Sequence, residues 1–191
     1  VEIMKNTGVA LKQAKSFRRG KAMFYEPAHA IEARDRMRLL NSLRQAFSAD
    51  YLFLQYQPFI DLASGRVVGA EALLRWKTEE GQFVPPDRFI PLAEQSGLMV
   101  ALGNWVTRSA LQFLARLHRE GISDFRMAIN VSHVQFREPD FVEKLEAAIA
   151  ACQVAPSSIE IELTESVAIE NFALIEQKLV ALRRVGVAVA I

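Results

Sequence analysis

The stretch RVVGAEALLRW, residues 66–76, decides the fold of this chain. It is apolar for most of its length and follows the turn residues Ser64 and Gly65, so it predicts a strand paired in an antiparallel hairpin with residues 52–60. Side chains alternate between the two faces of a strand. Glu71 and Arg75 therefore share one face of this largely apolar strand.

Further along the chain, apolar strands alternate with amphipathic helices. We expect strands over residues 125–131, 159–163 and 187–191, and helices over 85–119 (with a break at Gly97), 139–151 and 169–185. This alternation predicts an α/β fold with a parallel sheet, and a strand spacing of about 30 residues favours a (β/α)8 barrel of the TIM type. A full barrel needs eight strands and about 250 residues. Only about the first five strands are expected here, so we expect a piece of a longer protein, cut at both ends.

The composition excludes several classes of protein. The 191 residues hold 23 Lys and Arg against 22 Asp and Glu, which argues against a partner that is a nucleic-acid polymer bound through bulk charge. No stretch approaches the roughly 18 apolar residues of a membrane span. The single cysteine, Cys152, excludes an internal disulfide and a zinc-thiolate cluster. These features predict a cytoplasmic location, and membrane anchoring of a longer parent protein stays open.

Polar residues interrupt the apolar pattern on three of the strands. Besides Glu71, strand alternation puts Asn130 and Glu162 on polar faces near the carboxyl ends of their strands, where barrels place their chemistry. A plain internal salt bridge between Glu71 and Arg75 is the alternative for those two residues. Taken together, the three strands favour a functional site, since buried carboxylates are costly without a cation. Oxygen donors suit Mg²⁺, Mn²⁺ or Ca²⁺, and a neighbouring arginine suggests a phosphate substrate.

These residues lie in motifs that resemble the EAL-domain family of cyclic di-GMP phosphodiesterases. The resemblance covers about residues 40–191 and rests on segments in the family's order, namely Tyr56-Gln57-Pro58, Glu71-Ala72-Leu73-Leu74-Arg75-Trp76, Phe89-Ile90-Pro91-Leu92-Ala93-Glu94, Asn130-Val131-Ser132 and Glu162-Leu163-Thr164-Glu165-Ser166. Glu71 precedes Asn130 by 59 residues, and Asn130 precedes Glu162 by 32, as in such a domain.

The resemblance implies a modified (β/α)8 barrel that hydrolyses cyclic di-GMP to linear pGpG by a two-metal mechanism with attack by water. It implies that Glu71, Asn130 and Glu162 are catalytic residues that ligate Mg²⁺ or Mn²⁺. The same match implies three residues that bind substrate, which are Gln57, Leu74 and Arg75, and a supporting residue that fixes a neighbouring loop, which is Glu165.

The chain stops at Ile191, where the family begins a loop with two aspartates, and later family residues include a lysine. We therefore expect the 191 residues alone to be catalytically inactive. A catalytically degenerate receptor or scaffold module for cyclic di-GMP is the alternative function. A third interpretation is a phosphodiesterase that acts on a different phosphodiester.

The N-terminal residues resemble another family. Residues 9–15, Gly20 and Phe24-Tyr25 are similar to the last helix and strand of a GGDEF domain, the family of diguanylate cyclases. The expected division is a remnant of a GGDEF-like domain over 1–26, a linker helix over 27–49 and the first part of an EAL barrel over 50–191. It implies upstream GGDEF and sensory domains in the parent chain, and a homodimer stays open.

Overall fold

The computed structural model describes residues 27–163 and 172–190, and residues 4, 7, 8, 11 and 14. The chain divides into two compact units, residues 1–48 and 49–191. In the first unit, the helix expected over residues 27–49 is found as α2, Pro27–Ser48. Most of the residues assigned to a GGDEF-like remnant lie outside the described residues.

In its described residues, the second unit is built on one mixed sheet of six strands. β1 (Leu52–Ile60) and β2 (Val67–Lys77) form the expected antiparallel hairpin. β2, β4 (Arg126–Val131), β5 (Ile159–Leu163) and β6 (Ala188–Ala190) follow as parallel neighbours. The sheet order is β1-β2-β4-β5-β6, with β3 (Phe83–Val84) paired only to β2. The alternation of strands and helices thus predicted the parallel sheet correctly.

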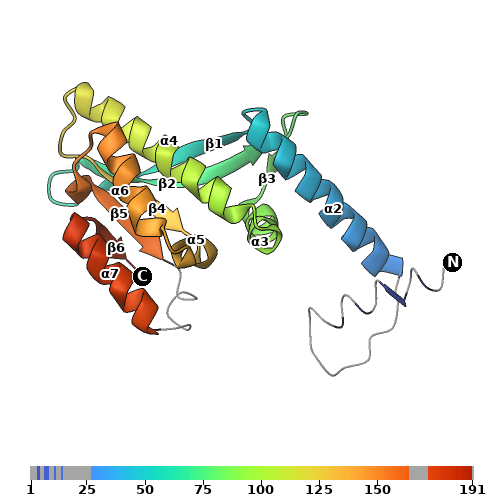
Figure 1. The fold of residues 1–191 in the computed structure, drawn as a ribbon. Coiled ribbons are helices and arrows are strands. Elements are labelled where there is room, and N and C mark those ends of the chain that lie inside the picture. Colours follow the sequence, from blue (N-terminus) through green and yellow to red (C-terminus); the bar gives the residue numbers. More distant parts are fainter. Residues whose placement is uncertain are drawn as a thin grey trace. The chain divides into compact units, whose positions relative to one another are not determined.

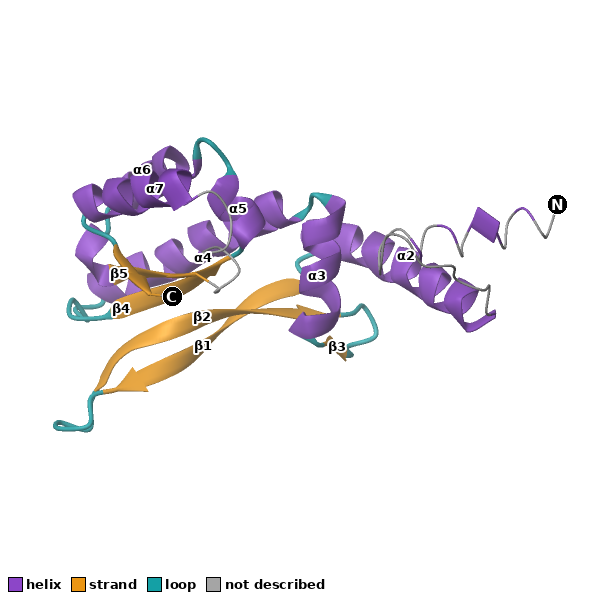
Figure 2. Ribbon diagram, turned by 90° about the horizontal axis from the view of Figure 1, so that it is seen from below, coloured by secondary structure: helices purple, strands orange, loops and turns teal. Residues whose placement is uncertain are grey.

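Helices pack against one face of this sheet. Figures 1 and 2 show α4 (Met99–Arg119), α6 (Phe141–Cys152) and α7 (Phe172–Val185) side by side on that face. The core between the layers is apolar and almost free of solvent, with Leu111, Met127, Ile161 and Leu182 all fully buried. Burial of this surface is the main stabilising contribution to such a layered fold.

Two glycines allow geometry that another residue would strain. Gly97 has φ 76° and ends α3 (Pro86–Ser96), which explains the helix break expected there. A Cβ atom at Gly69 would lie only 2.6 Å from the carbonyl oxygen of Arg126. Glycine at this position therefore lets β2 approach β4 closely enough to pair.

Three short elements were not expected from the sequence, and one of them is the 3₁₀ helix Pro156–Ser158. β3 has only two residues, and α5 (His133–Arg137) has five, so neither is long enough to show a periodic pattern. The five expected strands are found within the described residues as β1, β2, β4, β5 and β6, and β3 is an additional short strand. Ser132 accounts for α5, because its side chain caps the helix by accepting a hydrogen bond from the backbone of Gln135.

None of the helices in the described part of the chain is both long enough and apolar enough to span a bilayer.

Candidate active site on the polar face of the sheet

The two faces of β2 differ sharply in burial. Ala72 and Leu74 are 2% and 9% exposed on the face under the helices, whereas Glu71 and Arg75 are partly exposed on the opposite face. The alternation predicted for this strand is confirmed. We call the side that carries Glu71, Arg75, Asn130 and Glu162 the polar face, and Figure 2 shows α4, α6 and α7 on the other side of the strands.

Glu71 and Asn130 meet across the parallel pair β2 and β4. Glu71 is level with Ala128, and Asn130 lies two residues further along β4, near its carboxyl end. The Asn130 side chain donates a hydrogen bond from Nδ2 to Oε1 of Glu71 over 2.5 Å.

Glu162 completes the cluster from β5. It pairs in register with Asn130, and its pKa lies above the usual range for a carboxyl group. Burial is the largest cause, and the negative charges of Glu71 and Glu160 add to it, with a hydrogen bond to Glu71 as a smaller contribution. The negative charge of Glu71 thus lies close enough to Glu162 to disfavour ionisation of Glu162.

The chemistry of this cluster fits a hard divalent cation. Three neighbouring strands supply oxygen donors, namely Glu71, the amide oxygen of Asn130 and Glu162. A cation between the two carboxylates would offset the negative charge of Glu71 that raises the pKa of Glu162. Within residues 27–163 and 172–190, no group of three or more His, Cys, Asp or Glu is placed to hold a metal. The described donors therefore supply only part of a coordination shell.

Gln55, which was not expected to belong to the site, holds Arg75 on the polar face. Gln55 accepts a hydrogen bond through Oε1 from Nε of Arg75 over 2.8 Å, and Arg75 Nη1 donates to the carbonyl oxygen of Leu74 over 3.0 Å. Gln55 belongs to β1, two residues before Gln57, so the two glutamines share a face. That alternation could have identified Gln55.

Of the other residues expected in the site, Gln57 lies on the polar face and Leu74 does not. Gln57 is exposed on β1 and lies in register with Glu71, beside the cluster. The side chain of Leu74, in contrast, is buried on the helix side of β2, so only its backbone carbonyl is available near Arg75. Glu165 lies outside the described residues.

The model of the EAL domain family matches residues 40–191. The chain belongs to the EAL domain family. The Glu71, Asn130 and Glu162 cluster therefore lies within the matched EAL domain, and the α/β architecture described above is the fold of this family.

Several relatives of this EAL domain are cyclic di-GMP phosphodiesterases. The chain is 40% identical over 154 residues to "Cyclic di-GMP phosphodiesterase PA2567" and 35% identical over 190 residues to "Cyclic di-GMP phosphodiesterase NbdA", both of Pseudomonas aeruginosa. These matches cover 80% and 100% of this chain, but only 26% and 24% of the relatives. The chain thus spans about a quarter of the length of these curated relatives.

The solved structures agree with the family assignment. The structure described as "PaMucR Phosphodiesterase, c-di-GMP complex" is similar with a TM-score of 0.74 and 34% identity, covering 81% of this chain and 62% of that one. The "EAL enzyme Bd1971" in its cAMP-bound form gives a TM-score of 0.75 and 32% identity, covering 83% of this chain and 45% of the other. The EAL domain described here thus has the TIM-barrel-like α/β fold of these enzymes.

Proposed function

We propose that this EAL domain belongs to a cyclic di-GMP phosphodiesterase that hydrolyses its substrate to linear pGpG with Mg²⁺ or Mn²⁺. The observation that carries the proposal is the contact of Glu71, Asn130 and Glu162 on the polar face, which also carries Arg75 in a position fixed by Gln55. Oxygen donors that suit a cation and a guanidinium that suits phosphate thus share one face of the sheet, which supports a role in phosphodiester hydrolysis.

Each residue has a role in this proposal. Glu71, Asn130 and Glu162 would hold the divalent cations of a two-metal site. Such cations, when bound, lower the pKa of water and neutralise charge on the phosphoryl group. Arg75 binds a phosphate oxygen, with its guanidinium oriented by Gln55, and Gln57 lies where it can contact the nucleotide. Leu74 contributes through its backbone, and Glu165 supports a neighbouring loop.

The decisive experiment is Glu71→Gln in the intact protein that contains this chain. The amide keeps the shape of the side chain but loses the negative charge, so turnover of cyclic di-GMP at saturating Mn²⁺ should fall by at least 100-fold. A matched control is Glu146→Gln on the exposed surface of α6, which should retain wild-type turnover. Near-normal turnover by Glu71→Gln would refute the proposed role of this residue.

A receptor module would behave differently in the same assay. It would bind cyclic di-GMP in calorimetry without producing pGpG, and Glu71→Gln would then change no rate. A preference for another substrate is tested by comparing kcat/KM for cyclic di-GMP with that for cyclic di-AMP. Faster turnover of cyclic di-AMP would contradict the substrate proposed here.

We also infer that the parent protein is a GGDEF–EAL tandem, with residues 1–26 from the GGDEF-like domain and 27–49 as linker. The relative MucR of Pseudomonas aeruginosa, 34% identical over 170 residues, is described as a bifunctional diguanylate cyclase and cyclic di-GMP phosphodiesterase, which supports this arrangement. Diguanylate cyclase activity of the parent protein with GTP tests it directly.

A further inference from the structure

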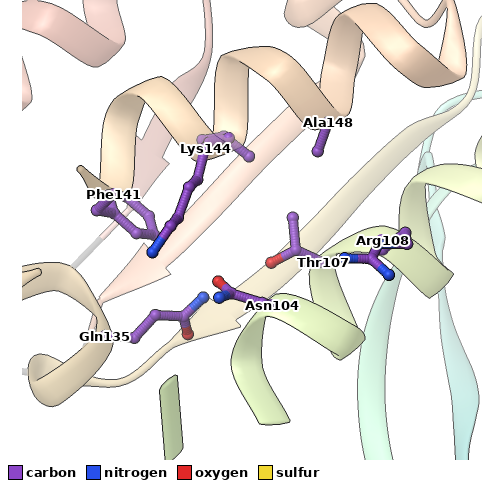
Figure 3. Close-up of a pocket in the computed structure, with 8 residues that line it drawn as sticks. Asn104, Thr107, Arg108, Gln135, Phe141, Lys144 and Ala148 are labelled. Atoms are coloured by element: carbon purple, nitrogen blue, oxygen red, sulfur yellow. The ribbon is translucent and has the colours of Figure 1, made fainter. Parts of the chain in front are cut away.

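A small cavity lies among the helices α4, α5 and α6, on the helix side of the sheet. Its volume is about 190 Å³, and its lining comprises Asn104, Thr107, Arg108, Gln135, Phe141, Lys144, Leu145 and Ala148. Figure 3 shows Asn104 and Thr107 of α4, Gln135 of α5 and Lys144 of α6 extending toward the same space. The polar face with Glu71 and Arg75 is on the opposite side of the sheet, so this cavity is separate from the candidate active site.

The cavity gathers polar groups that lack partners. Arg108 has no ion pair or hydrogen bond with any residue of the described part of the chain, and neither does the Thr107 hydroxyl, although Thr107 is only 7% exposed. Lys144 has one partner, because its Nζ lies 2.8 Å from Oδ2 of Asp140 on the same helix. The lining therefore contains two cations, one of them unpaired, and Asp140 is not part of it.

Gln135 is the most unusual residue of the lining. Its side chain is 2% exposed, and its Oε1 is buried without a hydrogen-bond partner. It packs against Gly103, where a Cβ atom would overlap the carboxamide, so glycine at this point of α4 makes room for the polar group. Rotation of the carboxamide exchanges Oε1 and Nε2, so either a donor or an acceptor can face the cavity.

A buried amide oxygen without a donor costs free energy, and rotation of the Gln135 carboxamide turns Nε2 toward the cavity, where a bound oxyanion accepts its hydrogen bond. Guanidinium, ammonium, hydroxyl and amide groups together favour an oxyanion. The side chains of Phe141 and Leu145 give the same cavity an apolar wall. At about 190 Å³ it is smaller than the roughly 300–1,000 Å³ of pockets for drug-sized ligands, which excludes a cyclic dinucleotide.

We infer that this cavity is a second binding site, which takes a small molecule with an oxyanion group and a compact apolar part. Arg108 and Lys144 pair with the oxyanion, Thr107 and Asn104 donate hydrogen bonds to it, and the apolar part packs on Phe141. Both phosphate monoesters and carboxylates have this chemistry, so the test includes one of each.

The test uses ligand-observed NMR on the intact protein that contains this chain, with saturating cyclic di-GMP and Ca²⁺ to occupy the candidate active site. The probes are phenyl phosphate and benzoate, with benzyl alcohol as the neutral control. We expect at least one anion to bind at millimolar or lower concentration and benzyl alcohol to bind at least tenfold more weakly. Stronger binding of phenyl phosphate identifies a phosphate monoester site, and stronger binding of benzoate identifies a carboxylate site.

Two variants assign the binding to the cavity. Arg108→Gln removes the unpaired cation from an exposed helix position, and Thr107→Val removes the hydroxyl with little change of shape. Each should weaken anion binding at least fivefold, while Arg119→Gln on the same helix should not. Both variants should keep wild-type turnover of cyclic di-GMP and wild-type melting temperature. Absence of anion binding, unchanged affinity in both variants, or equal binding of benzyl alcohol overturns the inference.

Discussion

Nδ2 of Asn130 lies 2.5 Å from Oε1 of Glu71, although 59 residues separate the two in the chain. The contact forms because β2 and β4 are parallel neighbours, and Asn130 stands at the carboxyl end of β4. Glu162 joins them from β5, in register with Asn130. The middle strand of the three thus carries the amide, and the strands on either side carry the carboxylates.

Asn130→Asp should make the protein depend more strongly on a divalent cation. The change removes the donor to Glu71 and adds a third negative charge beside two carboxylates, so without cation the free energy of unfolding should fall by about 1–3 kcal/mol. Added Mg²⁺ or Mn²⁺ should raise the melting temperature of this variant more than that of wild type. Calorimetry with EDTA and with cation measures both effects.

The control for added charge alone is Gln112→Glu, at an exposed position of α4. It should change neither the melting temperature nor its response to cation by more than a degree or so. An equal cation response in wild type and Asn130→Asp would show that the cluster does not bind the ion.

Glu162→Gln should stabilise the chain at neutral pH when cations are removed. The folded-state pKa of Glu162 is raised above the usual value of 4.5, so its ionisation is less favourable in the folded chain than in the unfolded chain. Wild type therefore loses stability as the pH rises from 4.5 through the folded-state pKa, and the neutral amide of the variant removes this loss. Melting temperatures in EDTA should coincide for the two proteins below pH 4.5 and separate in favour of Glu162→Gln above it. A constant difference at every pH would contradict this assignment.

Arg75→Ala should weaken the binding of cyclic di-GMP without affecting the fold. Loss of a charge-assisted hydrogen bond to phosphate costs about 1–3 kcal/mol of binding free energy. Calorimetry with Ca²⁺ in place of Mg²⁺ measures the affinity. Unchanged affinity would show that Arg75 serves only the contacts with Gln55 and Leu74.

Gln55→Leu should have a smaller effect of the same kind. The change removes the acceptor for Nε of Arg75, so the guanidinium loses its orientation but keeps its charge. We expect a loss of binding free energy of about 0.5–1.5 kcal/mol, the range for one neutral hydrogen bond. In the Arg75→Ala background the same change should have no effect. A full additional loss there would mean that Gln55 contacts the substrate directly.

Lys178→Met should destabilise the fold. Lys178 is only 7% exposed, and burial lowers the pKa of its ammonium group. Its Nζ donates hydrogen bonds to the carbonyl oxygen of Phe136 over 2.6 Å and to that of Glu138 over 2.5 Å. Methionine fills the space but leaves both carbonyl groups without this donor, so unfolding should require about 1–3 kcal/mol less free energy. Urea denaturation measures this free energy of unfolding, and Arg183→Met on the exposed side of α7 is the control. Equal midpoints for the two variants would contradict the role of Lys178.

Much of the candidate site was predictable because strand alternation is a local property. Side chains of β2 point to opposite faces with a period of two, so the placement of Glu71 and Arg75 on one face follows from their positions alone. The hairpin followed in the same way from the Ser64-Gly65 turn between two apolar runs. Elements of two and five residues, β3 and α5, were missed because they are shorter than any period that could reveal them.

The sequence by itself thus determined which faces of the strands are polar, where the long helices and strands occur, and which motifs resemble the EAL-domain family. Only the tertiary structure decided which polar groups touch. The contact between Asn130 and Glu71, the orientation of Arg75 by Gln55, and the buried amide of Gln135 beside Gly103 all join different secondary structure elements. Such contacts depend on strand register and helix packing, which are set by burial of the whole core and not by the local pattern of any one segment.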